Sequence, residues 1–257
     1  MPVMDEFREE REALKNESFK KKVEYFFYYY KWHVIGTLVT VIFLGTLAHD
    51  ILTAKDYALY GAFLNTYAQE EPMEEMTNEL ATLLEVDTDE YIVDIDTTLS
   101  IGGSSSLDAT GYTASEVSYT SQQKLMAYMA AAELDFIAAD QTTFLDYASS
   151  ETFYDLRQIL TPAQIEKYEP YFFYVDMEEV RKDEEEANNG NFDYVMREFD
   201  PADPSTCVDP VPIAIYINNS EKISEIFTFR EDLVPMGIVA NTKHLEDALF
   251  FLDYLFE

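Results

Sequence analysis

The sequence predicts a mixed α/β domain that follows one membrane-spanning helix, and three observations lead to this prediction. Residues 34–48 are all apolar, Gly or Thr, and no Asp, Glu, Lys or Arg occurs in residues 32–49. From residue 57 onward, apolar runs of strand length alternate with amphipathic helical patterns, which is typical of α/β folds. Cys207 is the only cysteine, which excludes an intrachain disulfide.

The apolar stretch is long enough to cross a bilayer. As a helix, its eighteen uncharged residues would span about 27 Å, close to the hydrocarbon thickness of a membrane. The aromatic run 25–30 and Trp32 precede it, and amphipathic rings of this kind prefer the headgroup level. We therefore predict a transmembrane helix over residues 33–52. A cleaved signal peptide and a buried core helix are the alternatives, and the poor small-x-small cleavage site around Ala48 argues against the first.

The charges on either side of the predicted span indicate its orientation. A Lys cluster at 20–22 and Lys31 lie on the N-terminal side of the span, which the positive-inside rule places in the cytoplasm. We expect residues 1–32 to form a cytoplasmic helix and an aromatic belt at the membrane surface. Residues 56–257 then form the extracytoplasmic domain of a single-pass protein of the cell membrane, and the lack of disulfides fits a bacterial source.

The charge of the chain excludes one class of partner. Residues 1–33 contain seven acidic and seven basic residues, whereas the rest of the chain contains 43 acidic and 10 basic residues. The formal net charge of -33 therefore belongs to the outer domain. Such a field repels nucleic acid and attracts cations or basic partners, so we expect no nucleic acid as a ligand. The alternative interpretation is that the acidity only keeps the domain soluble.

The outer domain reads as alternating strands and helices. Strand patterns occur at 57–65, 90–101, 135–140, 171–175, 212–217 and 233–241. Helical patterns occur at 70–86, at 113–134 with Thr113 or Ser115 as N-cap candidates, in two short pieces at 141–156 and 161–171, and at 242–257. A Gly-Gly-Ser-Ser-Ser turn is expected at 102–106. The first strand, helix and strand predict the beginning of a parallel βαβ sheet.

Residues 176–212 differ in character from the rest of the domain. They are acidic, rich in turn-forming residues and rich in Pro toward their end. Asn189-Gly190 is a typical two-residue hairpin sequence, and residues 192–196 could form the return strand. We therefore predict an inserted acidic hairpin and loop, not a second domain.

Two stretches resemble a known family. "KLMAYMAAAELDFIAADQTTFLDYASSETFYDL" (124–156) is similar to a helix, strand, Asp and helix pattern of the extracellular solute-binding proteins with the type II periplasmic-binding-protein fold. "PMGIVANTKHLEDALFFLDYLF" (235–256) is similar to the closing strand and helix of that family. Together the stretches cover roughly a fifth of the chain. The resemblance implies a two-lobed α/β domain of the type II periplasmic-binding-protein-like class, with a ligand cleft between the lobes.

The resemblance also suggests where a ligand would bind. In that family, and in open α/β sheets generally, ligand contacts come from loops at the carboxyl ends of strands. The candidate ligand-binding residues at these positions are Asn65, Thr66, Asp140, Gln141, Tyr216 and Asn218. The alternative is that these residues serve as turn and helix-cap residues, because strand-to-helix turns use the same residue types.

Catalytic signatures are missing from the sequence. No HExxH, GxSxG, P-loop or GxGxxG spacing occurs, and the acidic run 183–193 does not fit an EF-hand loop. Asp94 and Asp96 point to one face of a predicted strand and could pair as carboxylates, although solvated acids at such positions are commoner. We expect no catalytic residues, no metal and no cofactor.

Two functions remain as hypotheses. The first is the non-catalytic capture of a small solute or a peptide at the cell surface by a membrane-anchored binding protein. The second is a structural or assembly role in the bacterial cell envelope, in which a degenerate binding domain contacts another envelope protein. A polar cleft would favour the first function, and an exposed apolar patch would favour the second.

Overall fold

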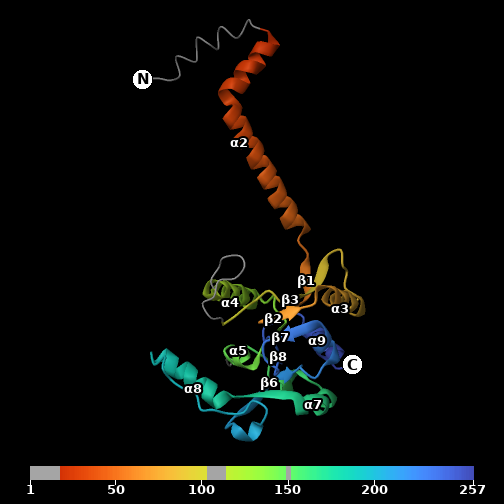
Figure 1. The fold of residues 1–257 in the computed structure, drawn as a ribbon, viewed down its shortest axis with the longest axis vertical. Coiled ribbons are helices and arrows are strands. Elements are labelled where there is room, and N and C mark those ends of the chain that lie inside the picture. The colour runs from red at the N-terminus through yellow and green to blue at the C-terminus, as the bar shows by residue number, and fades with distance from the viewer. Residues whose placement is uncertain (1–17, 103–113, 149–151) are drawn as a thin grey trace. The chain divides into compact units, whose positions relative to one another are not determined.

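The computed structural model describes residues 18–102, 114–148 and 152–257 (Figure 1). The chain divides into two compact units, Met1–Ala54 and Lys55–Glu257. The first unit contains one long apolar helix, and the second unit is mixed α/β. Four predictions fall outside the described residues, at least in part: residues 1–17 of the cytoplasmic helix, the N-cap Thr113, the turn at 102–106 beyond Gly102, and residues 149–151 of the helical piece at 141–156.

One helix, α2 (Phe19–Thr53), carries the whole predicted span. Residues Tyr30–Thr53 are long and apolar enough to cross a membrane, a property that a signal sequence shares. The hydroxyls of Thr40 and Thr46 donate to the backbone oxygens of Gly36 and Phe43, each at 2.9 Å. These bonds satisfy the hydroxyls within the helix, so the two threonines are compatible with a lipid environment.

Six strands of the second unit form one sheet in the order β3-β1-β4-β8-β6-β5. The strands are β1 (Asp56–Phe63), β3 (Tyr91–Asp96), β4 (Phe136–Ala138), β5 (Phe172–Asp176), β6 (Pro210–Tyr216) and β8 (Pro235–Ile238). β1 is parallel to β3 and β4, β8 is antiparallel to β4 and β6, and β5 is antiparallel to β6. β1, β3, β4 and β6 therefore run in the same direction, and their carboxyl ends lie at one edge of the sheet.

The predicted βαβ beginning is confirmed. α3 (Glu70–Leu83) connects β1 to β3, and α4 (Ala114–Ala131) precedes β4. Because α4 begins at Ala114, Ser115 lies inside the helix and is not its N-cap. The helix ends three residues earlier than predicted, since Ala132 adopts a left-handed φ of 53°.

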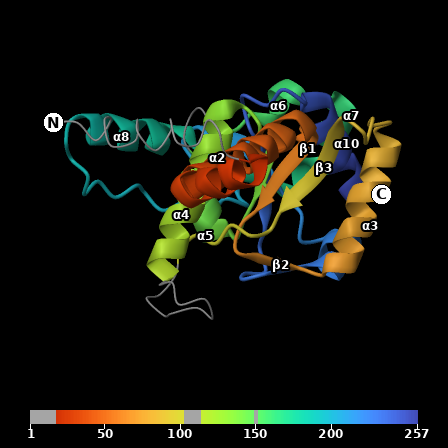
Figure 2. The same ribbon diagram turned by 90° about the horizontal axis from the view of Figure 1, so that it is seen from above.

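Helices cover both faces of the sheet, as Figure 2 shows from above. β1 alternates between two apolar clusters, with Leu59 and Phe63 in one and Tyr60 and Ala62 in the other. The first cluster includes buried residues of α3 and α10 (Leu245–Leu255), and the second includes buried residues of α4 and α5 (Gln141–Leu145). Gly61 of β1 has no space for a side chain, because an added Cβ would lie 1.9 Å from the Phe136 ring. The result is a three-layer α/β/α unit.

The short helices α6 and α7 begin at side-chain caps. Asp155 caps α6 (Leu156–Ile159), and Thr161 with Gln164 forms a reciprocal capping box for α7 (Pro162–Tyr168). Two short 3₁₀ helices, Glu169–Tyr171 and Pro204–Thr206, lie before β5 and before β6. The predicted helices at 161–171 and 242–257 are thus confirmed as α7 and α10.

The hairpin predicted around Asn189-Gly190 is wrong. Residues Met177–Asn188 form a helix, α8, whose N-cap is Asp176. Gly190 has a φ of 83°, and Asn191 N donates to Glu186 O at 2.9 Å, which is the Schellman end of a helix. The Asn-Gly pair therefore terminates a helix, because the preceding Glu-rich run favours helix over strand. Residues 192–199 return without regular structure instead of forming a strand.

A second, two-stranded sheet was not predicted. β2 (Thr66–Ala68) pairs antiparallel with β7 (Phe227–Phe229), and α9 (Glu221–Ile226) leads into β7. Strands of three residues are too short to show a period-2 pattern in the sequence. The described residues of 55–257 form one compact unit, so the second lobe that the resemblance implies is not a separate body.

Candidate functional site

The sheet brings together four of the six candidate residues in two pairs at its carboxyl edge. Asn65 follows β1 and contacts Asp140, which follows β4. Tyr216 at the end of β6 donates its hydroxyl to Gln141 Oε1 at 2.7 Å. These contacts exist because β1, β4 and β6 run in the same direction, as the general rule for open sheets anticipates.

Asn65 is the centre of this edge. Its Nδ2 donates to Asp140 Oδ2 at 2.9 Å and to the Thr143 hydroxyl at 3.0 Å, and its Oδ1 accepts from Ile101 N at 2.8 Å. The residue has a φ of 54°, a left-handed conformation that Asn tolerates better than most residues. One side chain thus joins the ends of β1 and β4 to the segment that follows β3.

Asp140 is buried and ionised. It caps α5 by accepting from Thr143 N at 2.9 Å, and it also accepts from the Thr143 hydroxyl at 2.9 Å. Burial alone would raise the pKa of this carboxyl, but the hydrogen bonds from Asn65 and Thr143 and the charge of Arg230 outweigh burial and lower the pKa. A negative charge therefore lies behind the carboxyl edge at neutral pH.

The other candidates have different surroundings. The Thr66 hydroxyl donates to Leu64 O at 3.0 Å, which is a local turn interaction. Burial raises the pKa of Tyr216 to about 12, so its hydroxyl stays protonated and acts as a donor. Among the described residues, the buried Oδ1 of Asn218 has no hydrogen-bond partner. Thr66 and Asp140 thus perform turn and cap functions, as in the alternative interpretation of the sequence, whereas Gln141 and Tyr216 bond to each other.

A pocket opens beside Asn65 at the same edge, and we call it the edge pocket. Its volume is about 300 Å³. Residues 65–67, parts of the segment 97–100, and residues 228–230 line it, so β2, β7 and the loop after β3 all contribute. The lining residues include Thr66, Ser100 and Thr228, which carry hydroxyl groups, and Arg230, which carries a guanidinium. This combination of donors suits an oxygen-rich, anionic group.

Arg230 differs from the other arginines of residues 55–257. Arg157, Arg181 and Arg197 pair with carboxylates at distances between 2.5 and 2.8 Å. Arg230 instead donates from Nη1 to Gly102 O at 3.0 Å, and no carboxylate of a described residue forms an ion pair with it. Sequence reasoning missed this residue. The scarcity of basic residues is the signal that could have found Arg230, since residues 34–257 contain only 10 basic residues against 43 acidic residues.

A second hollow of about 400 Å³ lies between the segment after β3 and α4. Lys124 lines it and pairs with Asp96 at 2.7 Å, while Tyr60 also donates to Asp96 at 3.2 Å. Burial would raise the pKa of Asp96, but the bonds from Lys124 and Thr98 lower it. Burial and the charge of Asp96 raise the pKa of Asp94. Asp96 is therefore neither half of a carboxylate pair nor a solvated acid, but a buried partner of Lys124.

None of the described residues that line the edge pocket is a His, Cys, Asp or Glu. His244 Nδ1 lies 3.2 Å from Oδ1 of the fully buried Asp135, which precedes β4 and so lies at the opposite edge of the sheet. Asp135 also accepts from Tyr60 N at 2.8 Å and from the Thr242 hydroxyl. The pair fixes the start of α10. In the described part of the chain, no group of three or more His, Cys, Asp or Glu side chains is placed to hold a metal ion.

A scan against models of known protein families, a search of curated proteins and a search of solved structures found no significant match to this chain.

Proposed function

We propose that this chain is a single-pass bacterial membrane protein that displays its α/β domain outside the cell and captures a small carboxylate-bearing solute or peptide in the edge pocket, without catalysis. The proposal rests mainly on the position of Arg230 in the edge pocket and on its lack of an ion pair among the described residues. The charge of Arg230 acts on the nearby Asp140, but its guanidinium forms no ion pair with a carboxylate of the described residues, so in a domain with a large excess of acids it is available to an external one. Arg binds carboxylates in a bidentate geometry that Lys does not reproduce.

The fold supports a relation to the type II solute-binding proteins. Residues 124–148 contain part of α4, then β4, Asp140 and α5, in the order of the pattern on which the resemblance rests, and residues 235–256 contain β8 and α10. The two stretches also lie side by side, because β4 pairs with β8. The edge pocket is at the carboxyl ends of β1 and β3, where open α/β sheets bind ligands.

The membrane anchor and its orientation rest on separate support. The apolar helix Tyr30–Thr53 has the length of a span, and its apolar side chains are exposed to the surroundings. The Lys-rich side of the helix favours a cytoplasmic N-terminus. An acidic domain on the outer face would also avoid the anionic inner leaflet.

A second function is favoured by one observation. Asn65, Asp140, Gln141 and Tyr216 satisfy one another by hydrogen bonds and leave few donors for a ligand. A degenerate binding domain that serves in the assembly of the cell envelope would have this property.

The test uses the full chain in detergent micelles and measures the thermal midpoint of the domain against panels of carboxylates, amino acids, short peptides and oligosaccharides. A ligand that binds only the folded state raises the midpoint as its concentration increases. We expect carboxylate-bearing compounds to do so, and we expect Arg230→Met to weaken their binding by about ten- to a hundred-fold, the range for hydrogen bonds to charged groups.

Lys243→Met is the matched control, because Lys243 also donates to a backbone oxygen only, that of Ala131, and lies outside the edge pocket. The control should leave binding unchanged. A cooperative melt with no shift for any compound would contradict the binding function and favour the assembly function.

A further inference from the structure

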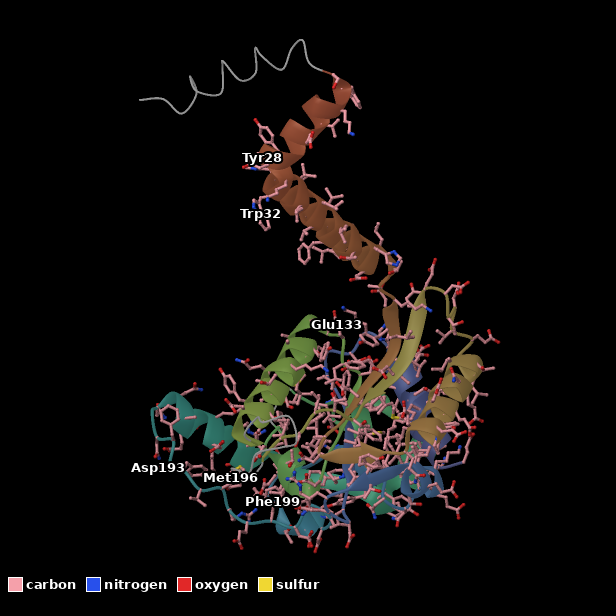
Figure 3. All side chains as sticks on the ribbon, turned by 45° about the horizontal axis from the view of Figure 1, so that its top comes forward. Tyr28, Trp32, Glu133, Asp193, Met196 and Phe199 are labelled. Atoms are coloured by element: carbon pink, nitrogen blue, oxygen red, sulfur yellow. The ribbon has the colours of Figure 1, made fainter. Side chains whose placement is uncertain are left out.

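The helix α8 and the segment that returns beside it form a projecting element, which we call the acidic arm (residues 177–200). Figures 1 and 2 both show α8 extending away from the sheet. Figure 3 shows Asp193, Met196 and Phe199 along the returning segment. No part of the edge pocket comes from the arm, so its role is separate from the proposed ligand site.

Two buried carboxylates connect the returning segment of the arm to α8 and its base. Asp176, at the base, is fully buried and accepts from Val208 N at 2.8 Å, from Asp209 N at 3.0 Å and from Arg197. Glu179 is 4% exposed and accepts from Tyr194, Arg197 N and Lys182 at 2.9 to 3.1 Å. The returning segment is thus tied to α8 by charge-assisted hydrogen bonds.

This ordered arm exposes apolar side chains. Phe192 is 84% exposed and Val195 is 83% exposed, the highest values for large apolar residues among the described residues of 55–257. Met196, next to them, is half-buried. An exposed apolar site on an element held by buried polar bonds indicates a contact surface.

The charge around these side chains restricts what can cover them. The arm contains nine acidic and three basic residues. All three cations already pair within the unit: Arg181 with Glu178 and Asp209, Lys182 with Glu178 and Glu179, and Arg197 with Asp176. Asp193 and Glu198 are exposed close to Phe192 and Val195 in the chain, and Glu185 is exposed on α8. Neutralising them requires cations from outside.

We propose that the acidic arm docks a cationic, amphipathic segment of a partner protein, whose apolar side chains cover Phe192 and Val195 and whose Lys or Arg residues face the carboxylates of the arm. Charge complementarity selects this occupant over an acidic or a purely apolar one. An acidic domain attracts any cation. Contact with Phe192 and Val195 would make the arm selective for a segment that also carries apolar side chains.

The test measures binding of a short labelled peptide of alternating Lys and Leu to the full chain in micelles, by fluorescence anisotropy. Two comparison peptides replace Leu by Ser or Lys by Ser. We expect the Lys-Leu peptide to bind at least several-fold more tightly than either comparison peptide. Binding should weaken when the salt concentration rises from about 0.05 to 0.5 M, since salt screens exposed charges.

Variants locate the site. Phe192→Ser with Val195→Ser should lower the affinity by roughly ten-fold or more, as expected for central apolar contacts. Met126→Ser, which changes an exposed apolar residue on α4, should not. Asp193→Asn with Glu198→Gln should reduce both the affinity and its salt dependence, whereas Glu74→Gln with Glu75→Gln on α3 should have little effect.

Three results would overturn the proposal. The first is equal binding of the Lys-Leu and Lys-Ser peptides, which would show only general charge attraction. The second is binding that the arm variants leave unchanged. The third is a change of molecular mass with the arm variants in light scattering, without peptide binding, which would identify a second copy of this chain as the occupant.

Discussion

Buried carboxylates with several donors are the residues that organise this domain. Asp96, Asp140, Asp176 and Glu179 are each at most 7% exposed, and each accepts at least three hydrogen bonds. The pKa of each of these carboxyls is lowered, so the folded state favours the charged form. The acidity of the sequence therefore has a structural component, besides the solvated charge that keeps the domain soluble.

Asp176 shows the consequence for stability against pH. Burial opposes its ionisation, but the bonds from Val208 N, Asp209 N and Arg197 lower its pKa below the unfolded value of about 3.9. The stabilisation it provides is therefore complete above about pH 5 and is lost as the pH falls through the unfolded and then the folded pKa. We expect Asp176→Asn to reduce the free energy of unfolding at pH 7 by about 2 kcal/mol and to flatten its decline below pH 4.

Near-UV circular dichroism of the full chain in micelles, titrated with urea from pH 7 to pH 2, measures this effect. Asp89→Asn, at an exposed site, is the control and should behave as the parent protein. A variant with the same acid sensitivity as the parent protein would show that Asp176 contributes no pH-dependent stability.

At the scale of elements, the stability of the C-terminal end of α8 depends on the left-handed conformation of Gly190. Gly190 has a φ of 83°, and an added Cβ would meet no atom within 4 Å, so a substitution there tests backbone strain alone. We expect Gly190→Ala to destabilise the end of α8 by about 1 kcal/mol. Amide hydrogen exchange should then become faster in α8 and stay unchanged in β1.

Asn188→Ala provides the comparison, because Asn188 is the last residue of α8 and is exposed. It should leave exchange unchanged or slow it slightly. Equal effects of both substitutions would argue that Gly190 does not need the left-handed conformation.

Elements with a clear hydrophobic pattern could be predicted from the sequence. Elements whose local sequence fits two structures, or shows no pattern, were predicted wrongly or missed. The six strands of the main sheet were found because each contains a short apolar or β-branched run, although β3 also carries Asp94 and Asp96. Asn189-Gly190 fits a hairpin turn and a helix end equally well, so only the helical preference of residues 177–188 could have decided it. β2 and β7 are held by pairing between residues 66–68 and 227–229, which no local pattern reports.

The candidate site was predicted in part for the same reason. The rule for carboxyl ends found Asn65 and Asp140, because parallel strands determine which loops meet. Arg230 lies just after β7, which the sequence did not reveal, so its place in the edge pocket followed only from the structure. The hydrogen bond between Gln141 and Tyr216 also depends on where β6 lies in the sheet, because Tyr216 is far from Gln141 in the sequence.

At the scale of the whole molecule, both proposals require that residues 55–257 lie outside the cell. A solute or a partner protein of the envelope can reach the edge pocket and the acidic arm only on that side. The same apolar helix would also suit a signal sequence, in which case the N-terminal residues would be removed from the mature protein. The side and the integrity of the chain are therefore the central claim.

The single cysteine makes this claim measurable. With Cys207→Ser as the background, Ser18→Cys and Glu75→Cys each give a chain with one exposed thiol, before the span and in the outer domain. A membrane-impermeant maleimide is applied to intact bacterial cells that express the full chain, with permeabilised cells as the control. We predict labelling of Glu75→Cys in intact cells and of Ser18→Cys only after permeabilisation, both on a protein of full-length mass. Labelling of Ser18→Cys in intact cells, or loss of the N-terminal residues from the mature protein, would contradict the account.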